Sequence, residues 1–106
     1  MSAARIFAAT MKTFIFVTVG YAKPTKEMMD AWTRWFEEIK EHVVDSGNPF
    51  GSVVEVTASG IREKPRDKYA IAGYIIIRAR DMAEAKNIAK TCPMITSMRV
   101  YEAMSM

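Results

Sequence analysis

The residue best suited to acid–base chemistry is His42, the single histidine of this 106-residue chain. It follows Glu38 by four positions, so the two side chains would share one face if both lie on a helix. A histidine paired with a carboxylate can serve as a general base near neutral pH. The alternative is a surface histidine stabilised by the dipole at a helix C-terminus, since no nucleophile accompanies the pair. His42 is therefore a candidate catalytic residue with a purely structural alternative.

Cys92 is the only thiol, and Pro93 follows it at the expected end of a helix. Reactive thiolates favour helix N-termini or basic neighbours, and Lys90 is the one cation close in sequence. We interpret Cys92 as a structural residue. One cysteine and one histidine form no zinc-ligand pattern, so neither a metal nor another cofactor is expected. A lone cysteine also excludes an intrachain disulfide framework and is consistent with the cytoplasm.

A stripe of large apolar residues predicts the best candidate binding site. Residues 28–36 include two methionines, two tryptophans and a phenylalanine at helical spacing. Core packing explains most of the stripe, but tryptophan is rarely fully buried, so one indole could border a cavity. Tyrosines and an arginine elsewhere could supply its polar ends. The candidate ligand-binding residues are Tyr21, Trp32, Trp35, Phe36, Tyr74 and Arg78.

The first half of the chain predicts two strands flanking a helix. Residues 12–19 are β-branched and aromatic, with apolar side chains on both faces, which is typical of a strand buried twice. Thr25 is expected to cap a helix that runs to residues 45–47, with Gly47 as its C-terminal cap. Residues 52–59 predict a second, more polar strand. Residues 60–68 are mostly charged and predict a solvated hairpin loop.

The second half predicts a strand, a helix and a returning strand. Residues 69–78 are rich in isoleucine, tyrosine and alanine and are expected to form a buried strand. Asp81 and Glu84 form a capping-box pattern at the start of the next helix. Pro93 ends that helix, and residues 98–102 begin the closing strand.

This order predicts an α+β fold, the ferredoxin-like βαββαβ arrangement with a four-stranded antiparallel sheet and both helices on one face. Its strand order would be 4-1-3-2, which places the apolar first and third strands at the centre. We expect residues 11–106 to form a single domain and residues 1–10 to be a mobile extension. No apolar run is long enough to span a membrane.

The helix-free face of this sheet is expected to need a partner. If Ile71, Ile75 and Ile77 face the helices, Tyr74 and Ile76 point the other way, along with alternate residues of the first strand. Soluble monomers rarely expose an apolar patch of this kind. A homodimer in which the two sheets face each other is the simplest arrangement that would bury this face.

Over roughly residues 12–103 the chain resembles a known family, mostly at positions that maintain the fold. They are Met11, Lys12, Thr13, Phe14, Trp32, Trp35, Gly47, Gly73, Tyr74, Ile75, Ile76, Asp81, Ala85, Ile88, Ala89, Cys92, Pro93, Val100, Tyr101 and Glu102. In these positions the chain resembles the YCII-related family of dimeric α+β barrel proteins. The resemblance implies a homodimer and, if the protein is an enzyme, cofactor-free lyase, isomerase or monooxygenase chemistry on a small cyclic or aromatic substrate.

Two family sites do not carry over to this chain. The Asp-Gly-Pro-Phe motif of one branch is absent from residues 62–68, and the early-helix histidine of another is absent from residues 28–31. The predicted function is therefore binding of a small organic molecule in an apolar cleft, with catalysis left open. The alternatives are a non-catalytic dimeric binding or regulatory module and RNA binding. The net charge of +3 is scattered and forms no basic tract, which disfavours RNA.

Overall fold

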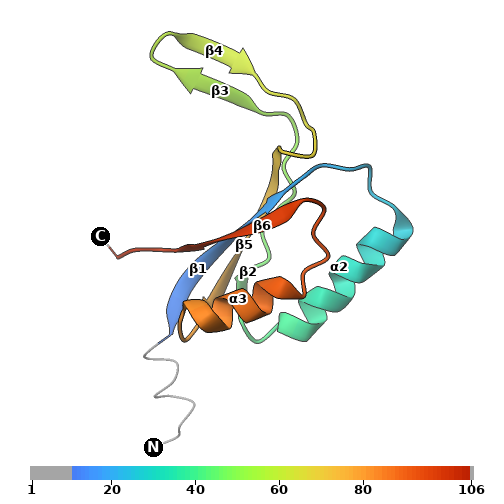
Figure 1. Ribbon diagram of the computed structural model, residues 1–106, viewed down its shortest axis with the longest axis vertical. Coiled ribbons are helices and arrows are strands. Elements are labelled where there is room, and N and C mark those ends of the chain that lie inside the picture. The colour runs from blue at the N-terminus through green and yellow to red at the C-terminus, as the bar shows by residue number, and fades with distance from the viewer. Residues whose placement is uncertain (1–10, 106) are drawn as a thin grey trace, which may run out of the picture.

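Four strands form one antiparallel sheet in the order β2-β5-β1-β6, and two further strands, β3 and β4, form a separate hairpin. The computed structural model describes residues 11–105. In chain order the elements are β1 (Lys12–Val19), α2 (Lys26–Ile39), β2 (Val43–Asp45), β3 (Val54–Thr57), β4 (Gly60–Glu63), β5 (Ile71–Ala79), α3 (Met82–Lys90) and β6 (Ser97–Glu102). Both helices lie on one side of the sheet (Figure 1). The predicted α+β class with a four-stranded antiparallel sheet is confirmed, and the predicted extension at residues 1–10 lies outside the described residues.

The core lies between the sheet and the two helices. Phe14 and Phe16 of β1 pair with Ile77 and Ile75 of β5, and all four side chains are buried on the helix side. Trp35 contributes the largest buried side chain from α2. Alternate residues of both central strands point to the helix-free face, as the doubly apolar pattern predicted. These two strands are central because both of their faces are apolar.

Ile71 and Val19 depart from the face assignment predicted for the central strands. Ile71 is 48% exposed, although it is separated from Ile75 and Ile77 by an even number of residues and was expected to share their face. Val19 is buried although it shares strand parity with Ile15. The register of β1 against β5 shifts between Thr18 and Val19, and a β-bulge of this kind moves the following side chains to the other face.

Both predicted helix starts are confirmed. The Thr25 hydroxyl accepts a 3.1 Å hydrogen bond from the backbone N–H of Met28, and the Asp81 carboxylate accepts one of 2.9 Å from that of Glu84. The Glu84 carboxylate reaches back to the backbone N–H of Arg80 rather than to that of the cap. It also pairs with the Arg80 guanidinium at 2.7 Å, which ties the end of β5 to the first turn of α3.

The predicted end of the first helix is wrong. The helix ends at Ile39, and Val43–Asp45 form an edge strand beside β5. The β-branched Val43 favours a strand, and the backbone N–H of Arg78 donates to the carbonyl of His42, so strand pairing replaces further helical turns. Gly47 is not a helix cap. It has φ +70°, and a Cβ there would overlap the carbonyl oxygen of Tyr74.

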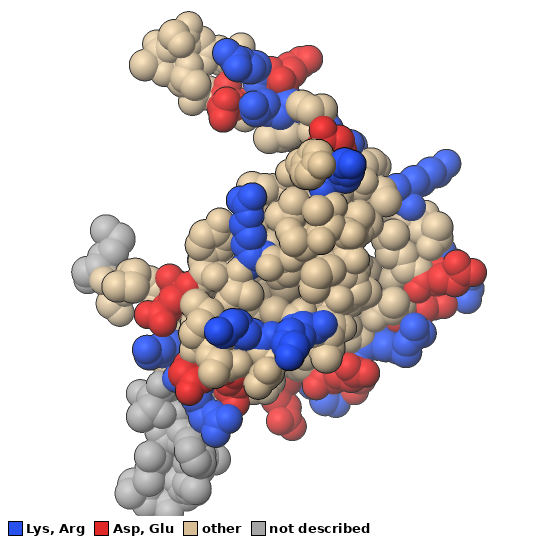
Figure 2. Space-filling view, in the orientation of Figure 1, with Lys and Arg blue, Asp and Glu red and all other residues tan. Residues whose placement is uncertain are grey.

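Two predictions for residues 52–63 are wrong: the strand there does not join the main sheet, and residues 60–63 are not loop. The second strand of the sheet is β2, whereas residues 54–57 pair with residues 60–63, which were predicted to be loop. This hairpin stands away from the sheet and helices (Figures 1 and 2). The alternating pattern therefore predicted a strand correctly but could not identify its neighbour, because hairpin pairing is set by the turn that follows.

The hairpin has one apolar and one charged face. Val54, Val56 and Ile61 share a face, and their side chains are 54%, 68% and 73% exposed. Glu55 and Arg62 oppose each other on the other face. An isolated two-stranded hairpin is marginally stable in water, and within residues 11–105 no element covers this apolar face.

Within residues 11–105, neither helix has the length and apolar character needed to cross a bilayer.

Candidate functional site

A cavity of about 710 Å³ lies between α2 and one end of the sheet. Figure 2 shows the surface hollowed beside this helix. The walls come from α2, from the ends of β1 and β5, and from the loops that precede α2 and follow β2. The lining residues are Thr18, Val19, Gly20, Tyr21, Ala22, Pro24, Met28, Met29, Trp32, Thr33, Phe36, Ser46, Asn48, Pro49, Phe50, Gly51, Arg66, Ala72, Gly73, Tyr74, Ile75 and Ile95. The volume falls in the usual range for small-molecule sites.

Three aromatic rings on α2 form the most rigid wall. Trp32 meets Trp35 edge to face with ring centroids 5.5 Å apart, and it lies 5.9 Å from Phe36. Trp35 and Phe36 are 5.3 Å apart. Trp35 is buried, whereas Trp32 is half-buried and faces the cavity. Packing against Trp35 therefore fixes Trp32 in position while leaving part of its ring available to a ligand.

Gly73 lies at the floor of the cavity, and its lack of a side chain lets the segment after β2 approach β5 closely. A Cβ there would lie 3.1 Å from the carbonyl oxygen of Asn48. The edge segment after β2 follows β5 closely, with a bridge between Pro49 and Gly73 and a 2.7 Å hydrogen bond from the Phe50 N–H to the Ala72 carbonyl. These backbone contacts hold the polar lining residues of this segment in place.

The mouth of the cavity is closed on one side by two loops that are bonded to each other. The backbone N–H of Gly20 donates to the carbonyl of Ala70 at 2.7 Å, and that of Tyr21 donates to the carbonyl of Asp67 at 2.9 Å. These bonds bring the guanidinium of Arg66 over the ring of Tyr21, 4.1 Å from its centroid. A cation–π contact of this kind orients the guanidinium at the cavity.

The structure brings together four of the six residues predicted to bind a ligand. Tyr21, Trp32, Phe36 and Tyr74 all line the cavity. Tyr74 lies at the rim of the cavity, where its ring stacks on that of Phe50 with centroids 5.8 Å apart. Its hydroxyl lies at the limit of hydrogen bonding from the Asp45 carboxylate, at 3.5 Å.

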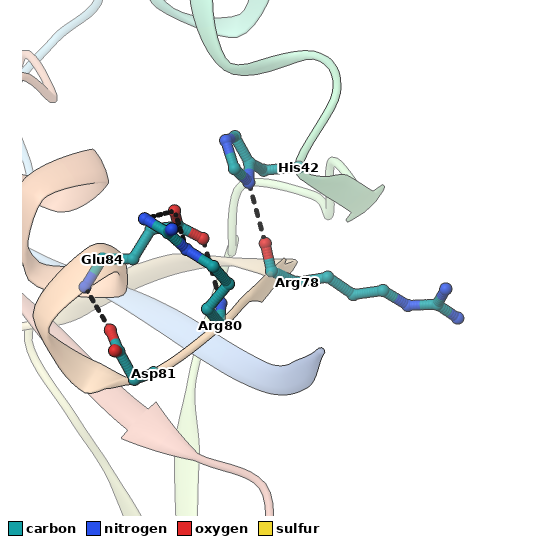
Figure 3. A network of polar contacts seen from close by, with 5 residues as sticks. All are labelled: His42, Arg78, Arg80, Asp81 and Glu84. Atoms are coloured by element: carbon teal, nitrogen blue, oxygen red, sulfur yellow. Dashed lines mark hydrogen bonds and ion pairs between the residues drawn. The ribbon is translucent and has the colours of Figure 1, made fainter. Parts of the chain in front are cut away.

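Trp35 and Arg78 do not line the cavity. Trp35 faces the core, 2% exposed, and its indole N–H donates to the Thr91 hydroxyl at 3.0 Å. Arg78 is exposed at the far end of β5, where its side chain points away from His42 (Figure 3). The sequence prediction gave Arg78 and Tyr74 as polar ends of one site, but four residues of strand separate them by about 13 Å.

Arg66 is a lining residue that sequence reasoning missed. It lies in a loop that was interpreted only as solvated, and among residues 11–105 it is the one charged side chain in the lining. Its partner Tyr21 is 45 positions earlier in the chain. No local pattern connects two loops at this separation, so only the fold reveals the pair.

His42 lies outside this cavity, in the turn between α2 and β2. Its Nδ1 is 3.0 Å from the carbonyl oxygen of Arg78 (Figure 3). A carbonyl only accepts, so Nδ1 carries the proton and Nε2 keeps its lone pair when the ring is neutral. The predicted pairing with Glu38 is wrong, because α2 ends at Ile39 and His42 has left the helix.

The surroundings of His42 form a second and more polar hollow of about 440 Å³. Arg80, Asp81 and Glu84 line it together with His42, and none of its lining residues belongs to the larger cavity. The Arg80 guanidinium and the Glu84 carboxylate form an ion pair with an N–O distance of 2.7 Å, and the Asp81 side chain caps α3. The charged groups beside His42 therefore serve the local structure.

Cys92 is a buried structural residue, as interpreted from sequence. It is 7% exposed, and burial raises the pKa of its thiol to about 12 by disfavouring the charged thiolate. At neutral pH the thiol stays protonated and is a poor nucleophile. Across residues 11–105, no three of the histidine, cysteine, aspartate and glutamate side chains gather closely enough to hold a metal ion.

A scan against protein-family models and a search of curated proteins both find no match to this chain.

Proposed function

We propose that this chain is a small-molecule-binding protein of ferredoxin-like, YCII-related type that works as a cytoplasmic homodimer. Its ligand occupies the cavity between α2 and the sheet. The strand order β2-β5-β1-β6 supports the ferredoxin-like assignment, because it equals 4-1-3-2 once the β3–β4 hairpin is treated as an insertion between the second and third strands. The four-stranded antiparallel sheet and its one-sided helices are the frame that this topology requires.

The observation that carries the proposal is the cavity wall formed by Trp32 and Phe36. A half-buried indole beside a concave apolar surface is the kind of group that planar organic ligands stack against. Met28 and Met29 extend the same wall and are adaptable in shape. Polar side chains such as Thr33 and Asn48 can orient a bound molecule.

Binding without catalysis is the form of the proposal that the geometry favours. The titratable lining residues are Tyr21, Arg66 and Tyr74, and none of these is a general base at neutral pH in its ordinary protonation state. His42 has an available Nε2 but belongs to the other hollow. Cofactor-free lyase, isomerase or monooxygenase chemistry remains the alternative. Turnover of a bound compound that is lost in His42→Ala would favour that alternative.

The homodimer is proposed to form through the helix-free face of the sheet. The cross-strand registers place Ile15 and Val17 of β1 beside Ile76 and Tyr74 of β5, with Tyr101 of β6 opposite Ile15. Among residues 11–105 these side chains are covered only in part: Phe50 stacks on Tyr74, Ile15, Val17 and Ile76 are half-buried, and Tyr101 is 48% exposed. A second copy would bury them by an isologous contact between the two sheets.

The hairpin supplies a second reason to expect a second copy. Its apolar face carries one charged residue, Glu63, opposite Val54. Arg78 of β5 and Arg99 of β6 lie on the helix-free face by their strand registers, and Asp45 lies on the same face at the opposite edge from Arg99. A hairpin that reaches past the end of its own sheet can therefore meet an apolar surface of complementary charge on the partner.

Native mass spectrometry of freshly purified protein tests the proposed function. We expect a dimer that carries a reproducible small adduct. Thr33→Phe places a ring in the cavity and should remove the adduct, whereas Arg34→Phe changes the neighbouring residue outside the cavity and should retain it. Equal adducts in both variants would place the ligand elsewhere. A stable monomer would contradict the dimer and favour the RNA-binding alternative.

A further inference from the structure

We infer that the ligand of this cavity is a planar aromatic or cyclic molecule with one anionic group, and that Arg66 binds the anion. The inference rests on the proposed function, because it names the chemical class that the same cavity would take. It is carried by the charge of the lining and by the position of the guanidinium.

The lining is electrostatically one-sided. Among residues 11–105, Arg66 is the one charged side chain in the lining, and no aspartate, glutamate or lysine contributes. The Asp45 carboxylate lies near the Tyr74 hydroxyl but outside the lining. A cationic ligand would therefore meet repulsion without compensation, and a neutral one would leave the guanidinium unused. Arg66 is exposed to solvent, so an anion would gain a charge-assisted hydrogen bond at the edge of an apolar surface, weakened by water and salt.

The guanidinium of Arg66 is oriented and has no anionic partner among residues 11–105. Every ion pair found in these residues involves other side chains: Lys12–Glu102, Lys26–Asp30, Lys40–Glu37, Lys64–Glu55 and Arg80–Glu84. The adjacent Asp67 uses its carboxylate to accept a 2.9 Å hydrogen bond from the backbone N–H of Tyr69. The Tyr21 ring holds one face of the guanidinium, which leaves its N–H edges for a carboxylate or a similar oxyanion.

The shape of the cavity indicates what the uncharged part of the ligand is. Trp32 and Phe36 offer ring faces, and Gly73 leaves space at the floor. A molecule that stacks on the indole and extends toward the loop of Tyr21 would bring its end group to Arg66. The inferred class is therefore an aromatic or cyclic carboxylate, with bidentate hydrogen bonds from the guanidinium to the carboxylate oxygens.

The test compares naphthalene-2-carboxylate with naphthalene-2-carboxamide, which have nearly the same shape and differ in charge. Binding is followed by ¹H–¹⁵N NMR at the two indole N–H signals, which the Trp32→Phe variant assigns. We expect both probes to shift the Trp32 signal, with the carboxylate bound about tenfold more tightly, a ratio typical of one charge-assisted hydrogen-bonded pair. Raising the salt concentration should reduce that difference.

Arg66→Gln should bring the carboxylate affinity down to that of the carboxamide and leave the carboxamide affinity unchanged. The matched control is Arg62→Gln on β4, which removes the same charge from a residue outside the lining. Equal affinities for the two probes, with no effect of Arg66→Gln, would overturn the anion inference and leave the cavity proposal standing. Absence of any shift at Trp32 with either probe would overturn both.

Discussion

The indole N–H of Trp35 donates a 3.0 Å hydrogen bond to the hydroxyl of Thr91, and this bond links α2 to the end of α3. Trp35 is thereby fixed in the core, while Trp32, one turn earlier on the same helix, is left at the cavity. The two tryptophans that sequence reasoning assigned to one ligand site thus have separate roles. One positions the helix and the other lines the cavity.

Thr91→Val tests the positioning role. The substitution keeps the shape of the side chain but removes the acceptor, so the indole N–H loses its partner in a largely buried place. We expect the free energy of unfolding to fall by about 1–3 kcal/mol, measured by chemical denaturation. Thr33→Val on the exposed surface of α2 is the control and should change stability by only about 0.5 kcal/mol or less. Equal effects at the two positions would show that the Trp35–Thr91 bond has no special role.

Ile76→Arg tests the proposed sheet-to-sheet dimer. Ile76 lies at the centre of the helix-free face, opposite Ile15, so a guanidinium there would bring a charged and strongly hydrated group into the dimer interface, with only the Asp45 carboxylate at the β2 edge beside it. Sedimentation velocity should give a dimer for the wild type and a monomer for the variant. Glu38→Arg on the exposed surface of α2 introduces the same group away from the face and should remain dimeric. A wild-type monomer at micromolar concentration contradicts the proposal.

The hairpin is expected to strengthen that dimer. Val56 and Ile61 oppose each other on its apolar face, and replacing both by threonine keeps β propensity while removing apolar area. The dimer dissociation constant should rise by at least about tenfold, since burying one such side chain is worth about 1.5–3 kcal/mol. The matched control replaces Glu55 and Arg62, which oppose each other on the charged face, by threonine. If the two double variants dissociate alike, the apolar face does not contact the partner.

Burial of Cys92 makes stability depend on pH in the alkaline range. The thiol pKa is 9.0 in its ordinary state and about 12 in the fold. Above pH 9 the unfolded chain releases this proton while the folded chain keeps it, so the free energy of unfolding falls as pH rises. The slope from this group approaches about 1.4 kcal/mol per pH unit. Cys92→Ala should lose this component, visible as a shallower stability curve between pH 9 and 11; parallel curves for the two proteins would contradict the assignment.

The elements that sequence patterns predicted well are those in which local and tertiary preferences agree. Asp81 and Thr25 cap their helices because capping depends on a few adjacent residues. The central strands were recognised because apolar residues on both faces fit only a covered strand. The position of Trp32 at a cavity followed from its size and from the helical spacing of its neighbours.

The errors arose where distant contacts decide the structure. Helical spacing continued through Val43, yet pairing with Ile77 of β5 makes it a strand residue. Alternation in residues 54–57 predicted a strand but carried no information about its partner. Arg66 and Tyr21 meet only because two loops are joined by backbone hydrogen bonds. The first and third of these errors reflect backbone hydrogen bonds between distant segments, whereas the β3–β4 pairing is local and depends on the turn between the two strands.

A crystal structure of the protein grown with naphthalene-2-carboxylate tests the α2 cavity most directly. The expected result is density for the naphthalene ring against Trp32 and Phe36, with the carboxylate at hydrogen-bonding distance from the Arg66 guanidinium. Density for the ring on the helix-free sheet face or on the hairpin, with the cavity filled only by solvent, would contradict both the location of the site and the role of Arg66.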